Sequence, residues 1–174
     1  MLAFFIRKKE KIGMFREMRR RKQILTQEEC KEILYRGTSG VLAVSGDDGY
    51  PYAVPMSYVY ADNRLYFHCA RKGHKKDALR RNDKVSFCVI DQDQIVPERY
   101  TTYFRSVIAF GKIREVTEKE EMKRILMLLA CKYASLQTEQ QHAEAIQAEW
   151  AEVCVLLLDI EHMSGKQAIE LVKD

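Results

Sequence analysis

The order of strand-like and helix-like stretches is the feature that most constrains the fold of this chain. Strand-like sequence recurs at residues 40–46, 51–60, 64–70, 84–90, 100–116 and 153–160, with one short helix-like stretch among the first five and two before the last. An alternating parallel sheet would need a helix after nearly every strand. The pattern therefore predicts a mainly β protein, a small closed antiparallel barrel with appended helices.

Turn and cap residues set the boundaries of these stretches. The turn at residues 47–49, Asp-Asp-Gly, joins the first two strands as a hairpin because Asp-Gly favours positive φ, and residues 61–63 form a second turn. Thr26 and Glu29 form a capping box at the start of a helix over residues 26–36. Further helices are predicted over residues 73–81, 117–134 with Thr117 as its cap, and 139–149.

Two prolines, Pro51 and Pro55, fall inside the second strand. Proline has no backbone N–H and cannot donate to a strand ladder. This strand must therefore lie at an edge, carry a bulge, or face something other than a neighbouring strand.

Charge is distributed unevenly along the chain. The 174 residues have a net charge of +4, but residues 1–22 hold nine Lys and Arg against two acidic residues, which leaves 20 basic and 23 acidic side chains in residues 23–174. This balance removes the main electrostatic argument for nucleic-acid binding by the body of the protein. We expect residues 1–22 to be a basic, poorly ordered leader and residues 23–174 to form a single domain.

The sequence shows no export signal or membrane segment. The apolar run over residues 1–6 precedes the positive charges, which reverses the order of a secretory signal, and it is too short to span a bilayer. The five cysteines are odd in number and include no Cys-x-x-Cys pair. This usage favours reduced thiols in a cytoplasmic protein over a disulfide framework.

The stretch FHCARKGHKKDAL, residues 67–79, places several cations where a helix begins. A helix N-terminus carries partial positive charge, so these cations are unfavourable there unless an anion is bound. Gly73 permits close approach of the backbone, and the first N–H groups of a helix are unpaired donors. The stretch indicates either a phosphate site at His74 and Lys75 or a solvated charged turn. The sequence contains neither the Rossmann nor the P-loop glycine pattern.

The same stretch gives little support to a metal site or a nucleophile. His68, Cys69 and His74 lie within seven residues, but successive strand residues point to opposite faces, so we predict no metal site. A nucleophilic Cys69 would need a base and an oxyanion site, and the sequence identifies neither. We therefore expect Cys69, like Cys88 and Cys154 in their apolar strands, to be a buried, inert thiol.

Arg105 lies in the apolar stretch YFRSVIAFG, where an unpaired charge would be costly. It indicates either a structural ion pair or a contact with a ligand.

Four stretches, taken in order, are similar to one protein family. They are GYPYAVPMSYVY, LYFHCARKGHK, YFRSVIAFG and IEHMSGKQAIEL. Together they resemble the pyridoxamine 5′-phosphate oxidase-like FMN-binding split barrels, and within them the nitroimidazole-resistance (Nim-type) branch. The resemblance implies a six-stranded antiparallel split β-barrel of Greek-key type with flanking helices. It also implies a homodimer with FMN bound noncovalently at its interface.

The resemblance further implies which residues would bind FMN. Residues of two strands would face the isoalloxazine and the ribityl chain, a third strand would approach the ring edge, and His74 and Lys75 would hold the phosphate. The strand residues are Val54, Pro55, Met56, Ser57, His68, Cys69, Ala70, Arg105 and Ser106. Three other cations, Arg71, Lys72 and Lys76, would stay on a solvated face.

By the same resemblance, His68 is the catalytic candidate. A histidine that titrates near neutral pH could supply a proton while the flavin supplies electrons, although an ordinary ring packed against the cofactor is the other interpretation. We expect a flavin-dependent reductase that passes electrons from NAD(P)H or a protein donor to a nitroaromatic or related small-molecule acceptor.

Two other functions stay open at this point. One is a flavin- or haem-binding module without turnover. The other is a pyridoxamine 5′-phosphate oxidase-like oxidase, which His74 disfavours because the vitamin-processing enzymes usually carry arginine beside the lysine at that place.

Overall fold

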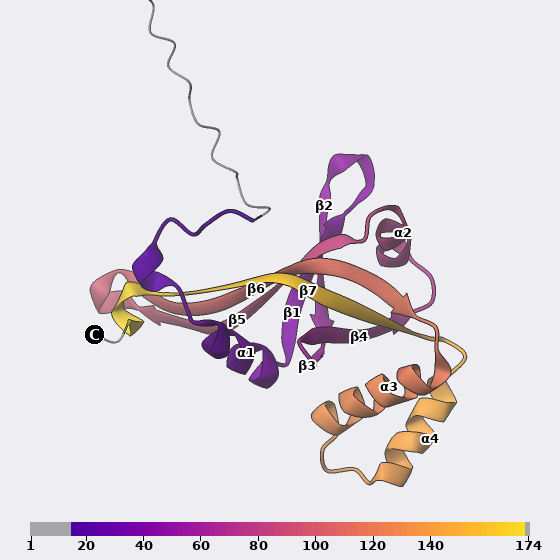
Figure 1. The fold of residues 1–174 in the computed structure, drawn as a ribbon. Coiled ribbons are helices and arrows are strands. Elements are labelled where there is room, and N and C mark those ends of the chain that lie inside the picture. Colours follow the sequence, from indigo (N-terminus) through magenta and orange to yellow (C-terminus); the bar gives the residue numbers. More distant parts are fainter. Residues whose placement is uncertain (1–14, 173–174) are drawn as a thin grey trace, which may run out of the picture.

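A single curved antiparallel sheet and four α-helices account for most of residues 15–172, the part of the chain that the computed structural model describes (Figure 1). The strands are β1 Ser39–Ser45, β2 Pro51–Ser57, β3 Val59–Ala61, β4 Arg64–Ala70, β5 Lys84–Val96, β6 Thr101–Val116 and β7 Val153–Gln167. The helices are α1 Gln27–Arg36, α2 His74–Arg81, α3 Lys119–Tyr133 and α4 Glu139–Glu149.

The strand order explains how this sheet becomes a barrel. The order is β2-β1-β5-β6-β7-β4-β3, so the two edge strands, β2 and β3, are consecutive in the chain and only Tyr58 separates them. A sheet whose edges are joined by one residue must curl until those edges meet. The predicted split-barrel fold class is confirmed, with seven strands rather than six because the stretch 51–60 breaks at Tyr58.

The break at Tyr58 is held by the C-terminal end of α3. The backbone N–H of Tyr58 donates to the Tyr133 hydroxyl at 2.8 Å, and that hydroxyl lies 2.7 Å from the Tyr58 carbonyl and also contacts the Thr38 carbonyl. Lys132 donates to the Gly37 carbonyl at 2.5 Å, with its ammonium 4.5 Å from the centre of the Tyr58 ring. These contacts satisfy backbone groups that have lost their sheet partners.

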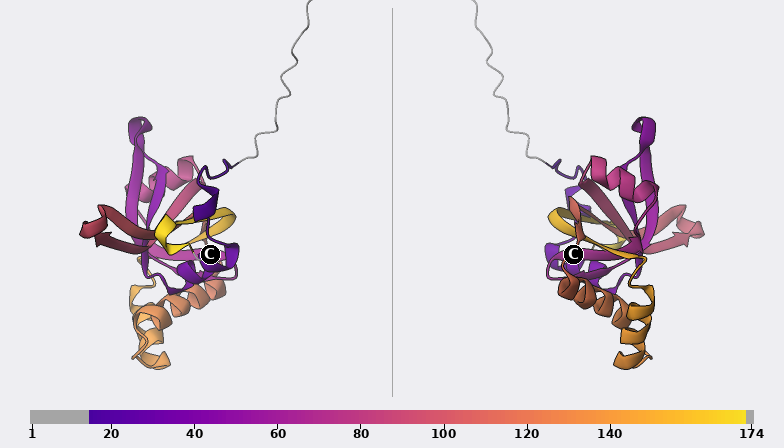
Figure 2. Two further views of the ribbon diagram at one scale, coloured as in Figure 1. Left: turned by 90° about the vertical axis from the view of Figure 1, so that its left-hand side faces the viewer. Right: turned by 90° about the vertical axis from the view of Figure 1, so that its right-hand side faces the viewer.

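Two apolar cores lie on opposite faces of β4 and β7, because side chains alternate along a strand. Leu65, Phe67 and Leu156 belong to the barrel interior. Tyr66 and Leu157 belong to a second core that α3 and α4 cover at one end of the molecule (Figure 2). Strand β4, which carries three of the predicted site residues, is thus buried from both sides along part of its length.

Two predictions that depend only on neighbouring residues agree with the structure. Thr26 and Glu29 form the predicted capping box of α1, and the proline-containing β2 is an edge strand that pairs with β1. The prediction that Thr117 caps α3 is wrong, because the helix begins at Lys119 and Glu118 caps it. Residues 1–14 of the predicted leader lie outside the described residues.

Two strands are longer than predicted. The predicted 84–90 extends to Val96, and the predicted 153–160 extends to Gln167. Both extensions pair with the long strand β6, and their sequences are too polar to be recognised as strand without that partner.

Replacing Tyr133 by Phe removes the hydroxyl that serves the Tyr58 backbone. We expect the free energy of unfolding to fall by roughly 1–3 kcal/mol, because a buried donor and acceptor lose their partner. Chemical denaturation measures the change. Tyr35→Phe is the matched control, since the Tyr35 side chain is 74% exposed and should alter stability little. Equal stability of the two variants would contradict a structural role for this hydroxyl.

Candidate functional site

The N-terminus of α2 is left open by its own side chains. Thr26, Glu118 and Thr138 each accept a hydrogen bond from the first turn of α1, α3 and α4, whereas the cap of α2 is Gly73, which has no side chain. Gly73 has φ 122°, and a Cβ at that position would meet no atom within 4 Å. No side chain caps the first amides of α2, and the backbone conformation at its cap is one that glycine adopts most readily.

Lys75 extends from this helix end toward β2. Its ammonium donates to the Met56 thioether sulfur at 2.9 Å, its one hydrogen-bond partner among residues 15–172. A thioether is a weak acceptor and carries no charge. The ammonium also acts electrostatically on the Cys69 thiol of β4. Three predicted site residues, from α2, β2 and β4, are thus brought together around a cation that lacks an anionic partner in this part of the chain.

His74 is held in a different way. Its ring stacks on Tyr52 of β2, with centroids 4.2 Å apart and planes 12° apart, and its Nε2 lies 3.2 Å from a carboxylate oxygen of Asp47. Arg81 donates to the other oxygen of Asp47 at 2.5 Å. His74 therefore has a carboxylate neighbour, whereas Lys75 does not.

The prediction that Arg71, Lys72 and Lys76 stay on a solvated face is wrong for Lys76. Arg71 and Lys72 are exposed, but Lys76 is 5% exposed, with its ammonium 2.5 Å from a Glu115 oxygen and 3.1 Å from the Cys154 sulfur. No local pattern indicates this burial, because Glu115 and Cys154 lie 39 and 78 residues away along the chain. The hydrogen bond from Lys76 lowers the pKa of Glu115 below its usual 4.5.

The predicted flavin-facing residues of β2 and β4 are divided between two faces of the sheet. Val54 and Met56 turn toward the barrel core, while Pro55 and Ser57 are exposed on the outer face. On β4, Cys69 packs against the core, and its neighbours His68 and Ala70 are exposed on the opposite side. The alternation follows from strand geometry, so one planar ligand cannot touch every predicted side chain from the same side.

His68, the catalytic candidate, is exposed on β4 opposite Val155 of β7. It makes no hydrogen bond or ion pair with any of residues 15–172. The imidazole is thus free to meet a molecule from outside this part of the chain.

The outer face of the sheet carries a continuous apolar row. Pro55, Val41, Cys88 and Ile108 are register partners across β2, β1, β5 and β6, and directly opposed residues point to the same face. Val41 and Ile108 are each 37% exposed. Ile90, which is 67% exposed, lies two residues from Cys88 and pairs with Ser106. The predicted residues Pro55, Ser57 and Ser106 therefore lie on one face.

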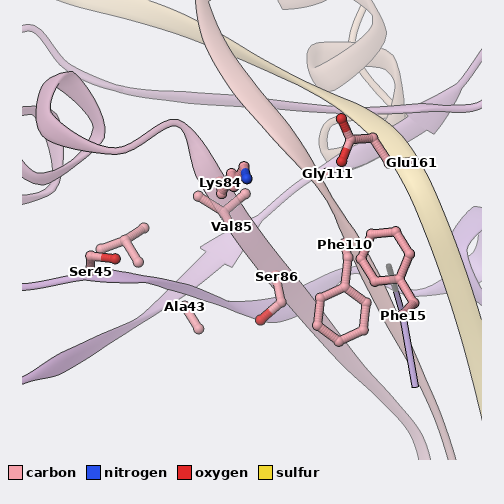
Figure 3. Close-up of a pocket in the computed structure, with 10 residues that line it drawn as sticks. Phe15, Ala43, Ser45, Lys84, Val85, Ser86, Phe110, Gly111 and Glu161 are labelled. Carbon is pink, nitrogen blue, oxygen red and sulfur yellow. The ribbon is translucent and has the colours of Figure 1, made fainter. Parts of the chain in front are cut away.

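Next to this row is a cavity that the sequence did not predict. It has a volume of about 420 Å³, and its floor includes Ala43, Ser86 and Phe110, which are register partners across three strands. Phe15 covers one side, with its ring centroid 5.5 Å from that of Phe110 (Figure 3). Nothing local marks these residues, because only the strand register brings them together.

Arg105 lies further along β6. Its guanidinium donates to the Gln167 side chain at 3.3 Å and lies 3.8 Å from Asp91, which Arg36 also binds at 2.7 Å. Its buried Nε has no hydrogen-bond partner among the described residues. Arg105 therefore forms a structural ion pair, which is one of the two interpretations of this residue from the sequence. Its Nε–H remains available as a donor to a molecule from outside the described residues.

Residues 15–172 contain neither a cluster of metal-ligating side chains nor a helix that could span a membrane. No group of three or more His, Cys, Asp and Glu side chains in this range is arranged to hold a metal ion. The helices of the same range include none with the length and apolar character needed to cross a membrane.

Comparison with known proteins identifies the family. The family model described as pyridoxamine 5′-phosphate oxidase matches residues 26–167. The chain belongs to this family. The match covers every strand of the barrel and confirms the resemblance seen in the four sequence stretches.

Individual relatives agree with this assignment. An uncharacterised protein of Rhizobium meliloti (strain 1021) is 33% identical over 94 residues, a match that spans 54% of this chain and 57% of that protein. A structure described as a FAD-binding protein from Mesorhizobium loti is 26% identical, with a TM-score of 0.63 over 84% of this chain and 97% of the other. A candidate 5-nitroimidazole antibiotic resistance protein of Bacteroides thetaiotaomicron has the same fold, with 22% identity and a TM-score of 0.69 over 83% and 86% of the two chains.

The ion pair between the buried Lys76 and the half-exposed Glu115 predicts a pH dependence of stability. Because the folded pKa of Glu115 is lowered, its contribution is complete above pH 4.5 and is lost as the pH falls through the folded pKa. Glu115→Gln should therefore unfold more easily than the parent protein at pH 7, by on the order of 1 kcal/mol after screening at this half-exposed carboxylate.

This difference should shrink on acidification below pH 4.5. Denaturant titrations at several pH values measure it, with Glu144→Gln on the exposed face of α4 as the control. A difference that stays constant with pH would show that the carboxylate charge is not the cause.

Proposed function

We propose that the protein is an FMN-binding homodimer that acts as a flavin-dependent reductase of the Nim type. The observation that carries the proposal is the position of Lys75, an ammonium without an anionic partner among residues 15–172, at the open N-terminus of α2 and against Met56 of β2. A phosphate there would accept hydrogen bonds from the first amides of the helix and from the ammonium. The residues present thus fit the phosphate end of FMN.

The remaining predicted residues define where the rest of the flavin would lie. Backbone and outward side chains of residues 54–57, together with the exposed side of β4 at His68 and Ala70, would flank the ribityl chain and the ring. His74, which Tyr52 and Asp47 hold in place, would border the phosphate.

A second copy of the chain would complete the site. The apolar row through Val41 and Ile108 is exposed in the single chain, as expected for a surface that a partner covers. Arg105 and Ser106, further along the same sheet, would then contact the flavin bound mainly by the other protomer. The unpartnered Nε of Arg105 is a donor suited to that contact.

The chemistry divides between cofactor and protein. Bound FMN would supply electron transfer from NAD(P)H or a protein donor to a nitroaromatic or similar acceptor. The protein would neutralise the phosphate through Lys75, exclude water from the ring through the apolar dimer face, and hold a proton on the imidazole of His68 for transfer to the acceptor.

Lys75→Ala should weaken FMN retention by about tenfold or more, because it removes the ammonium that would pair with the phosphate. Lys72→Ala is the matched control, since Lys72 is an exposed cation three residues earlier in the chain. Fluorescence titration of the apoprotein with FMN measures both. Equal loss in the two variants would mean that α2 does not hold the phosphate.

The reductase function is tested by anaerobic reduction with NADH or NADPH followed by addition of a nitroimidazole. We expect bleaching of the flavin and then its reoxidation, and a lower rate in His68→Ala with unchanged FMN binding. A flavoprotein that no nicotinamide donor reduces would overturn the reductase and leave a binding module. A Soret band would indicate haem, mass analysis of the released flavin separates FMN from FAD, and turnover of pyridoxamine 5′-phosphate would indicate the oxidase.

Ile108→Glu should convert the homodimer into a monomer, because it places a charge in the apolar row that the partner would cover. Light scattering coupled to size-exclusion chromatography measures the mass. Leu136→Glu is the control, since Leu136 is 97% exposed between α3 and α4. A monomeric parent protein would contradict the proposed assembly directly.

A further inference from the structure

Two cysteines face each other across the antiparallel strands β4 and β7. Cys69 and Cys154 are direct register partners. Directly opposed residues of antiparallel strands have Cα atoms roughly 4.5–5.5 Å apart. A disulfide spans Cα separations of about 4.4–6.8 Å, so the backbone already has the spacing that a bond between the two sulfurs requires.

The two thiols differ in access. Cys154 is 1% exposed, whereas Cys69 is half-buried at the end of β4 that leads to α2. A small oxidant from solvent would reach Cys69 first, and Cys154 would be the second thiol to react.

Charged groups surround the pair on the inner side. The Lys76 ammonium lies 3.1 Å from the Cys154 sulfur, and the Cys154 thiol donates to a Glu115 oxygen at 3.3 Å. Hydrogen bonding between the two cysteines lowers the pKa of Cys69 from 9.0 to about 7 and raises that of Cys154. The fields of Lys75 and Lys76 add to the lowering at Cys69, and burial opposes it. The thiolate is the reactive form of cysteine, so these groups favour reaction at Cys69.

The other thiols of the described chain lack this arrangement. Burial raises the pKa of Cys30 to about 11 and also raises that of Cys88. Cys131 is exposed, with its sulfur 3.8 Å from the His142 ring, but no second cysteine of residues 15–172 pairs with it.

We propose that Cys69 and Cys154 form a peroxide-oxidised thiol pair that closes a reversible disulfide between β4 and β7. The Cys69 thiolate attacks one oxygen of a hydroperoxide, the O–O bond breaks, and Cys69 sulfenic acid forms with release of water or an alcohol. The Cys154 sulfur then attacks the Cys69 sulfur, the S–O bond breaks and a second water leaves. Two thiols thus lose two electrons and two protons, and the peroxide is reduced by two electrons.

Reduction reverses the bond through the same two residues. A dithiol attacks the accessible Cys69 sulfur, and Cys154 leaves as a thiolate beside the Lys76 ammonium. Lys76 is in this respect a positioning residue for the leaving sulfur. This proposal does not depend on flavin binding.

The test treats the full-length protein with one equivalent of hydrogen peroxide, blocks free thiols, and maps the tryptic peptides without reduction. We expect one linked peptide pair containing Cys69 and Cys154, which dithiothreitol removes. Cys154→Ser should instead accumulate Cys69 sulfenic acid that dimedone traps. Cys69→Ser should lower the peroxide reaction about tenfold or more, because it removes the accessible thiol of the pair, whose thiolate is the reactive form.

Cys88→Ser is the control and should leave the linked peptide unchanged. A parent protein in which peroxide oxidises Cys131 while Cys69 and Cys154 stay alkylatable would overturn the proposal. A linked pair found only between two chains on a non-reducing gel would overturn it as well. Because the parent protein alone decides both outcomes, misfolding of a variant does not obscure the result.

Discussion

Tyr58 is the residue on which the barrel depends, because it is the one link between the two edges of the sheet. Its backbone bonds to the Tyr133 hydroxyl rather than to a neighbouring strand, and this lets β2 end and β3 begin without an unpaired buried amide. The closure sets β2 beside the region where β4 leads into α2. Met56 and Lys75, which are 19 positions apart in the sequence, come into contact there and form the candidate anion site together with the start of α2.

Because side chains alternate along the strands, the two faces of the sheet carry different sets of residues. The inner face is filled by apolar residues and, near the start of α2, by Cys69 and Cys154 with Lys76 and Glu115. The outer face keeps Pro55, Ser57 and the row through Val41 and Ile108 exposed. We propose that flavin and the second protomer share this outer face. The thiol pair belongs to the inner face.

Much of the fold follows from local rules. The capping box of Thr26 and the Asp-Gly turn depend on neighbours within a few residues, and the structure confirms both. The edge position of the proline-containing β2 is one of the three alternatives that the sequence left open. The full lengths of β5 and β7 depend on pairing with β6, which a single stretch of sequence does not contain. The break at Tyr58 likewise depends on Tyr133, 75 residues later.

The candidate site could likewise be predicted only where neighbouring residues determine it. The cations at the start of α2 indicated an anion from helix electrostatics alone, and the family resemblance narrowed that anion to a flavin phosphate. The burial of Lys76 was not predictable, because it depends on Glu115 and Cys154 from two distant strands. The reactive environment of Cys69 was missed for the same reason, since its thiol partner is 85 positions away and reaches it only through the register of β4 and β7.

Whether this barrel binds flavin is read most directly from the visible absorption spectrum of the purified protein. We expect the bands of oxidised flavin at one flavin per chain, or their appearance when the protein is reconstituted with FMN and freed of excess cofactor. A colourless protein that retains no FMN after reconstitution would contradict this expectation.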